Sequence, residues 1–108
     1  MLIRFFVEAK EKKEALKLVE GNLAFFEKTL KIERINEVSQ YWKIKNTFLV
    51  EMLVTPQRNV FQLKCFLEFF SDSWLEFGYP VDEFLASKNN NNCTYMKDKF
   101  VLIDIFTA

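Results

Sequence analysis

Three separated segments of the chain share one pattern, a charged residue at the centre of an apolar run. The segments are residues 2–6, 49–53 and 102–106, and their central charges are Arg4, Glu51 and Asp104. Side chains alternate between the two faces of a strand, so three neighbouring strands of this kind would share one wholly apolar face. That face is expected to hold Ile3, Phe5, Val7, Val50, Met52, Val54, Val101, Ile103 and Ile105.

The opposite face of such a sheet would also be apolar, except at the three charges. Its apolar residues would be Leu2, Phe6, Leu49, Leu53, Phe100, Leu102 and Phe106. A sheet that is apolar on both sides needs a cover on each face, and charges within it must be paired or hydrated. We therefore expect a doubly covered sheet.

Two stretches have apolar residues at the alternating steps of three and four that are typical of an amphipathic helix. In residues 8–31 these are Leu16, Val19, Leu23, Phe26 and Leu30, and in the second stretch they are Val60, Leu63, Leu67, Phe70 and Trp74. Thr55 followed by Pro56 predicts the start of the second helix, with Asn59 as a rival cap. Each stretch is expected to pack its apolar stripe on the sheet.

Residues 35–45 alternate between apolar and polar side chains, which predicts a strand with one hydrated face that turns at 45–47 into the run 48–54. The order strand, helix, strand, strand, helix, strand predicts an α+β single domain over 1–108, a ferredoxin-like βαββαβ sandwich. Its antiparallel sheet would have two helices on one face. Residues 75–98 form an extra segment, with a short strand at 75–77, helix or strand at 81–86, and a further strand at 93–96.

The composition narrows the class of partner. Fifteen basic and fifteen acidic residues cancel, so no global positive field favours binding to nucleic acid or to an acidic membrane. We find neither a signal-peptide pattern nor an apolar run of membrane-spanning length, and we expect a cytoplasmic protein.

Cys65 and Cys93 are expected to be reduced thiols, with Cys65 in the core. The abundance of Phe, Lys, Asn and Ile is typical of an AT-rich coding sequence and favours a bacterial or phage origin.

Several kinds of chemistry are excluded by residues that the chain lacks. It has no histidine, which removes Ser-His and Cys-His nucleophile pairs and most zinc and iron sites. With only Gly21 and Gly78, it has no glycine-rich phosphate loop. We therefore predict no catalytic residues, no metal and no cofactor, and an enzyme is the less favoured class.

Arg4, Glu51 and Asp104 have two interpretations. In a ferredoxin-like sheet the first strand lies between the third and the last, which places Arg4 between the two carboxylates. The three residues would then form either a ligand-binding site with a carboxyl of raised pKa, or a structural ion triad that closes a covered face.

A second candidate site is the stretch from Glu68 to Glu83, which is acidic, contains no Lys or Arg and is interleaved with aromatic residues. Charges steer an encounter between proteins and desolvated rings hold it, so this pattern favours a surface for a basic partner. The predicted partner-binding residues are Glu76, Phe77, Tyr79, Asp82 and Glu83, beside Trp74. The aromatic residues would otherwise belong to the core, with the acids as a hydrated rim.

Two functional hypotheses follow. The first is a non-enzymatic protein-binding domain that recognises a basic partner, and a bacterial immunity protein that neutralises a toxin is one concrete version. The alternative is a ferredoxin-like homodimer that binds a small ligand or substrate on the sheet face around Arg4, Glu51 and Asp104, as a ligand sensor or a cofactor-free enzyme.

Overall fold

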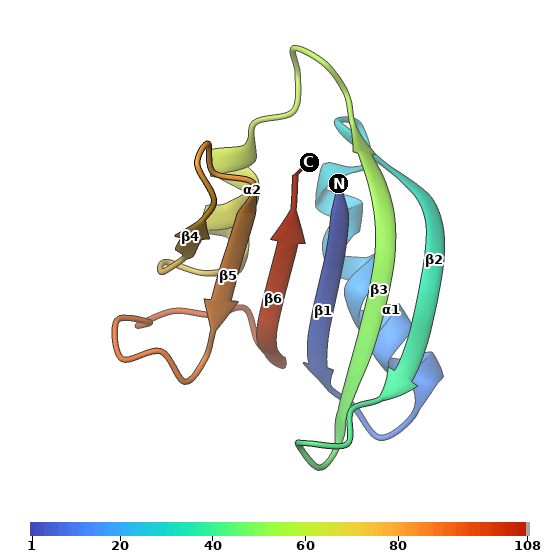
Figure 1. Ribbon diagram of the computed structural model, residues 1–108. Coiled ribbons are helices and arrows are strands. Elements are labelled where there is room, and N and C mark those ends of the chain that lie inside the picture. The colour runs from blue at the N-terminus through green and yellow to red at the C-terminus, as the bar shows by residue number, and fades with distance from the viewer. Residues whose placement is uncertain (108) are drawn as a thin grey trace.

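The computed structural model describes residues 1–107 and has an α+β fold with one antiparallel sheet and two α-helices. The strands are β1 (Leu2–Glu8), β2 (Leu30–Gln40), β3 (Thr47–Pro56), β4 (Leu75–Phe77), β5 (Glu83–Ser87) and β6 (Phe100–Phe106). The helices are α1 (Lys12–Leu23) and α2 (Leu63–Phe70), and a 3₁₀ turn, η1 (Ala24–Phe26), follows α1. The six strands lie in the order β2-β3-β1-β6-β5-β4, and both helices lie behind the same face (Figure 1).

The α+β class, the antiparallel sheet and the position of β1 between β3 and β6 are confirmed. The ferredoxin-like βαββαβ topology is not matched, because the strand order is different. Two further strands, β4 and β5, come between α2 and β6 in the chain and extend the sheet beyond β6. The extra segment 75–98 thus supplies strands at 75–77 and 83–87.

The face toward the helices forms the core, as the alternation in β1, β3 and β6 predicts. Ile3, Phe5, Val7, Val50, Met52, Val54, Ile103 and Ile105 are fully buried. Phe66 and Phe70 of α2 are also fully buried, with ring centroids 5.1 Å apart in an edge-to-face arrangement. Full burial of each such side chain contributes about 1.5–3 kcal/mol, so this layer is the main source of stability.

A bulge at the start of β6 corrects the expected position of Phe100. The pairing of β1 with β6 shifts by one residue there, which places Phe100 opposite Val7. Phe100 therefore faces the helices instead of the second face of the sheet. Its ring centroid lies 5.7 Å from that of Phe5 and 5.3 Å from that of Phe70.

The first helix is shorter than its apolar spacing predicts. α1 ends at Leu23, and Leu30, expected on the helical stripe, is instead the first residue of β2 and is buried opposite Pro56. β2 ends at Gln40, so Trp42 lies in the following loop, where it is 83% exposed, and not in a strand. Pairing of β2 with β3 along its whole length overrides the local helical spacing.

The second helix begins later than Thr55 and Pro56 predict. Both residues belong to β3, and the sheet pairing continues past them, because the N–H of Gln57 donates to the carbonyl of Thr29 at 2.8 Å. Gln62, and not Thr55 or Asn59, precedes the first helical residue. Among the described residues no helix is both long and apolar enough to cross a membrane.

Trp74 and Cys65 do not lie where the sequence predicts. Because α2 ends at Phe70, Trp74 lies outside the helix, yet it packs on the core with its indole N–H donating to the carbonyl of Leu67 at 3.0 Å. Cys65 was expected in the core but is exposed, and Cys93 is partly buried; both are free thiols.

Candidate functional site

We call the face of the sheet away from the helices the open face. It faces the viewer in Figure 1, and no part of residues 1–107 crosses its middle. The loop after β2 covers only one end, where the rings of Tyr41 and Phe6 pack edge to face with centroids 4.8 Å apart. The second cover that the sequence predicts is not formed by residues 75–98, whose strands β4 and β5 extend the sheet at its edge instead.

A row of charged side chains runs across the open face. Arg4 is opposite Glu51 on one side and Asp104 on the other, and Glu51 is opposite Glu37 of β2. The expected position of Arg4 between the two carboxylates is therefore confirmed. The sequence did not single out Glu37, because its place in the row depends on two register shifts in β2.

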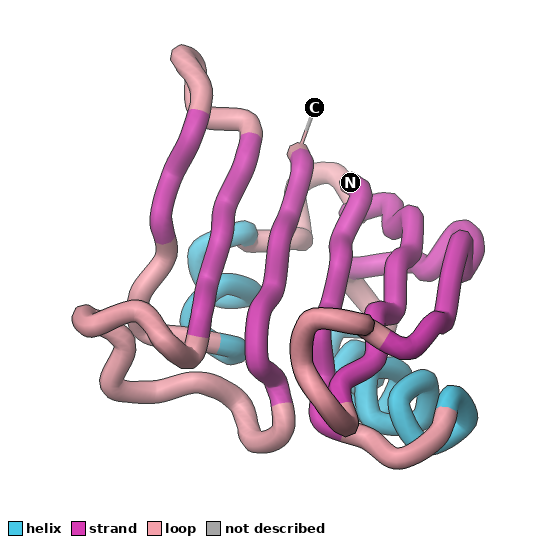
Figure 2. The backbone as a smooth tube through the Cα atoms, turned by 60° about the horizontal axis from the view of Figure 1, so that its bottom comes forward, coloured by secondary structure: helices cyan, strands magenta, loops and turns pink. Residues whose placement is uncertain are grey.

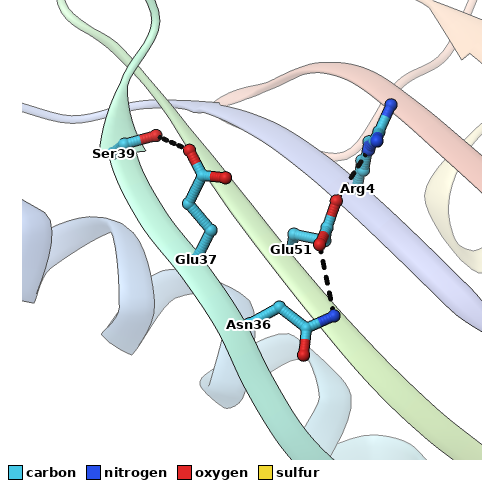
Figure 3. A network of polar contacts seen from close by, with 5 residues as sticks. All are labelled: Arg4, Asn36, Glu37, Ser39 and Glu51. Atoms are coloured by element: carbon cyan, nitrogen blue, oxygen red, sulfur yellow. Dashed lines mark hydrogen bonds and ion pairs between the residues drawn. The ribbon is translucent and has the colours of Figure 1, made fainter.

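Arg4 makes an ion pair with only one of its two neighbouring carboxylates. Its Nε donates to Oε1 of Glu51 at 2.8 Å, and Nδ2 of Asn36 donates to Oε2 of the same carboxylate at 3.2 Å (Figure 3). These bonds to the charged form hold the pKa of Glu51 below its usual value, and they raise that of Arg4. Beside them, the hydroxyl of Ser39 donates to the carboxylate of Glu37.

Asp104 is the unpaired member of the row. Its Oδ1 is buried and has no hydrogen-bond partner among the described residues. Burial, followed by the neighbouring carboxyl of Glu83, raises the pKa of Asp104 to about 7, against the opposing charge of Arg4. The three predicted residues are thus an ion pair, Arg4 with Glu51, and a carboxyl, Asp104, whose pKa is raised by burial and by Glu83.

The predicted partner-binding residues lie on the β4–β5 hairpin, which adjoins this row. Glu83 is opposite Phe106 of β6 and Phe77 is opposite Glu83, so all three lie on the open face. Leu85 is opposite Asp104 and therefore shares that face too. The two candidate sites, treated as separate in the sequence, form one continuous surface.

The other predicted residues lie at the tip or on the reverse side of the hairpin. Tyr79 is fully exposed in the turn between β4 and β5, which Gly78 enters with a φ of 102°. Asp82 closes this turn, since its N–H donates to the carbonyl of Phe77 at 3.0 Å. Glu76 is opposite Phe84 and so belongs to the other face of the sheet, although it is exposed.

The hairpin half of the open face is acidic and apolar. Of the acidic residues at 75–87, Glu83 lies on this face and Asp82 lies in the turn, whereas Glu76 lies on the reverse side. Asp104 adds a carboxyl beside Glu83, and residues 75–87 contain no Lys or Arg. The basic side chains Lys31 and Arg34 lie on β2, the opposite edge of the sheet. Within residues 1–107, no three Cys, Asp or Glu side chains come together in a way that could hold a metal ion. The surface is suited to binding a cationic, partly apolar partner.

In comparisons with known proteins, no family model, no curated protein and no solved structure matches this chain.

Proposed function

We propose that this chain is a non-enzymatic protein-binding domain that recognises a basic protein through the hairpin half of its open face. Inhibition of the partner, in the manner of a bacterial immunity protein, is the version that we favour. The observation that carries the proposal is that Phe77 and Glu83 of the hairpin share one face with Phe106 and Asp104 of β6. Apolar anchors and carboxylates are thereby interleaved on a surface to which the described chain adds no cover.

The hairpin supplies two exposed aromatic rings that a partner would contact. The exposed rings of Phe77 and Tyr79 would supply contact area at low conformational cost.

The charges on the face fit the same role. Asp82 and Glu83 would steer a basic partner over a distance of about 10 Å at moderate salt. Asp104 is less costly to desolvate than an ordinary carboxylate, because its pKa of about 7 lets it enter the interface as a neutral acid. Where the partner brings a cation close to it, Asp104 can instead ionise.

The test compares two variants with equal changes in charge. In the first variant, Asp82→Lys and Glu83→Lys reverse the charge of two side chains of the hairpin. In the control, Glu20→Lys and Glu27→Lys reverse the charge of two exposed side chains outside the open face. Proteins captured from host lysate are identified, and the tightest is titrated against each variant at two salt concentrations. We expect the hairpin variant alone to lose affinity, with a steep salt dependence for the wild type.

A third variant, Tyr79→Ser, removes a ring that is fully exposed and therefore tests the contact of this ring with the partner. It should weaken the complex at both salt concentrations, since ring burial is not screened. Equal loss of binding in the hairpin and control variants, or none in either, would overturn the proposal.

The alternative is a homodimer whose two open faces enclose a small ligand or substrate. The observation that favours it is that Asp104, whose Oδ1 is buried without a hydrogen-bond partner among residues 1–107, lies opposite Arg4. This arrangement is able to bind a polar group or transfer a proton. Light scattering separates the two: a monomer at about 100 µM excludes a dimer of useful affinity. A dimer that dissociates on Leu102→Glu would support the alternative instead.

A further inference from the structure

The lower end of the sheet in Figure 1 carries a depression that the proposed function does not use. Three loops meet there, the loop after β1, the β2–β3 loop and the β5–β6 loop, as Figure 2 shows with this end brought forward. The depression has a volume of about 530 Å³. Its charged lining consists of four lysines, Lys10, Lys45, Lys88 and Lys99, and two glutamates, Glu8 and Glu14.

The backbone holds these loops together on either side of the end of β1. The N–H of Glu8 donates to the carbonyl of Lys99 at 2.7 Å, and the N–H of Ala9 donates to the carbonyl of Asn46 at 2.9 Å. The β2–β3 and β5–β6 loops are therefore fixed to the same two residues of the chain. Lysines from three loops are brought to one site by hydrogen bonds that do not involve their side chains.

The charges in the depression do not balance. Nζ of Lys88 lies 3.4 Å from Oε1 of Glu8, so the charges of this lysine and this glutamate offset one another. Lys10, Lys45 and Lys99 make no ion pair within residues 1–107, and only Glu14 remains to offset them. A cleft lined mainly by one sign of charge concentrates counter-ions. The surplus of two positive charges in a neutral chain therefore points to an anionic occupant.

We propose that this depression binds a small phosphate-bearing molecule, as a phosphate monoester or diphosphate with two negative charges. Lys10, Lys45 and Lys99 would contact the phosphate oxygens, a role for which the compact ammonium group is well suited. Ala9, Ile44 and Val101, which also line the depression, would contact the uncharged part of the ligand. The depression lies where Lys88 follows β5, and the hairpin turn lies at the other end of that strand.

The probe for this site is inorganic pyrophosphate, added to ¹⁵N-labelled protein and followed by amide chemical shifts. We expect saturable shifts at residues 9–10, 44–47, 88–89 and 99, with a dissociation constant below about 10 mM. The double variant Lys45→Gln and Lys99→Gln should weaken binding by about tenfold or more, since it removes two of three unpaired cations. Both side chains are exposed, so the fold is preserved.

The matched control is Lys28→Gln with Lys64→Gln, which removes the same charge from exposed lysines outside the depression. Its affinity for pyrophosphate should equal that of the wild type. Shifts spread over lysines all around the surface, equal weakening in both double variants, or a response that stays linear beyond about 10 mM would each overturn the proposal.

Discussion

Replacing Asp104 with asparagine should stabilise the fold, and the gain should grow as the pH rises from 5 to 8. In the folded state the carboxyl has a pKa of about 7 instead of its ordinary 3.8, mainly because it is buried and secondly because Glu83 lies beside it. Between these two values the folded chain binds more protons than the unfolded chain. The free energy of unfolding of the wild type must therefore fall as the pH rises through this range.

The magnitude follows from the difference between the two pKa values. One pKa unit corresponds to 1.36 kcal/mol, so ionising Asp104 between pH 5 and pH 7 costs the fold at most about 3 kcal/mol. The group is partly exposed, and solvent screening reduces this figure to about 1–2 kcal/mol. Asparagine is uncharged at every pH and escapes the cost.

The assay is urea unfolding of both proteins at pH 5 and pH 8, followed by circular dichroism. Glu51 and Asp72 have lowered pKa values, so the stability that they contribute is lost only at pH values below this range. Glu83→Gln serves as a second variant, since it removes a group that raises the pKa of Asp104 and should flatten the pH dependence. A wild type that is equally stable at both pH values, or an Asp104→Asn variant that is destabilised equally at both, would refute the reasoning.

Two further predictions concern packing and the hairpin turn. Phe70→Ala should lower the free energy of unfolding by about 3–5 kcal/mol, because the ring is fully buried between both layers. Phe25→Ala removes a ring that is 76% exposed and should lower the free energy of unfolding by less than about 1 kcal/mol. Comparable losses for the two variants in urea unfolding would contradict this assignment of the core. Gly78→Ala should destabilise the chain by about 1–3 kcal/mol, since its φ is 102° and a Cβ atom would contact Asp82 and lie 2.8 Å from the carbonyl oxygen of Pro80. Gly21→Ala in α1, where a Cβ meets nothing within 4 Å, should instead stabilise by up to about 1 kcal/mol, and thermal unfolding of the two variants should show shifts of opposite sign.

The three central strands could be predicted because their signal is local and strong. β1, β3 and β6 each carry an apolar run with alternate residues fully buried, so the face that each residue occupies follows from its position alone. Phe100 is the exception, since a bulge defined by the partner strand reverses its direction.

Two of the element boundaries that were wrong depend on partners distant in the sequence. Leu30 continues a helical spacing and Pro56 follows a good helix cap, so either residue could belong to a helix by local criteria. In the fold they are opposite one another as the first residue of β2 and the last of β3. The many backbone hydrogen bonds of that pairing outweigh a preference of a few tenths of a kcal/mol per residue.

The sequence predicted the residues of the candidate site but not that they form one continuous surface. Arg4, Glu51 and Asp104 were recognised from three strands, and Phe77 and Glu83 from composition. That they share one face depends on the pairing of β5 with β6, across a connection at 88–99 that has no periodic pattern. For two strands joined by such a loop, the sequence does not determine which residues lie opposite one another.

The central position of β1 has a consequence for how the chain folds. Its two neighbours are β3 and β6, and the pairing of Leu2 with Phe106 joins almost the first described residue to almost the last. A ribosome delivers β1 before β6, so the edge of β1 that pairs with β6 stays without its partner until residues 100–106 have been made. Contacts between such distant segments slow folding, and an unpaired apolar edge invites association with other chains. We therefore expect folding to be completed only after release of residues 100–106, and nascent chains to depend on chaperones until then.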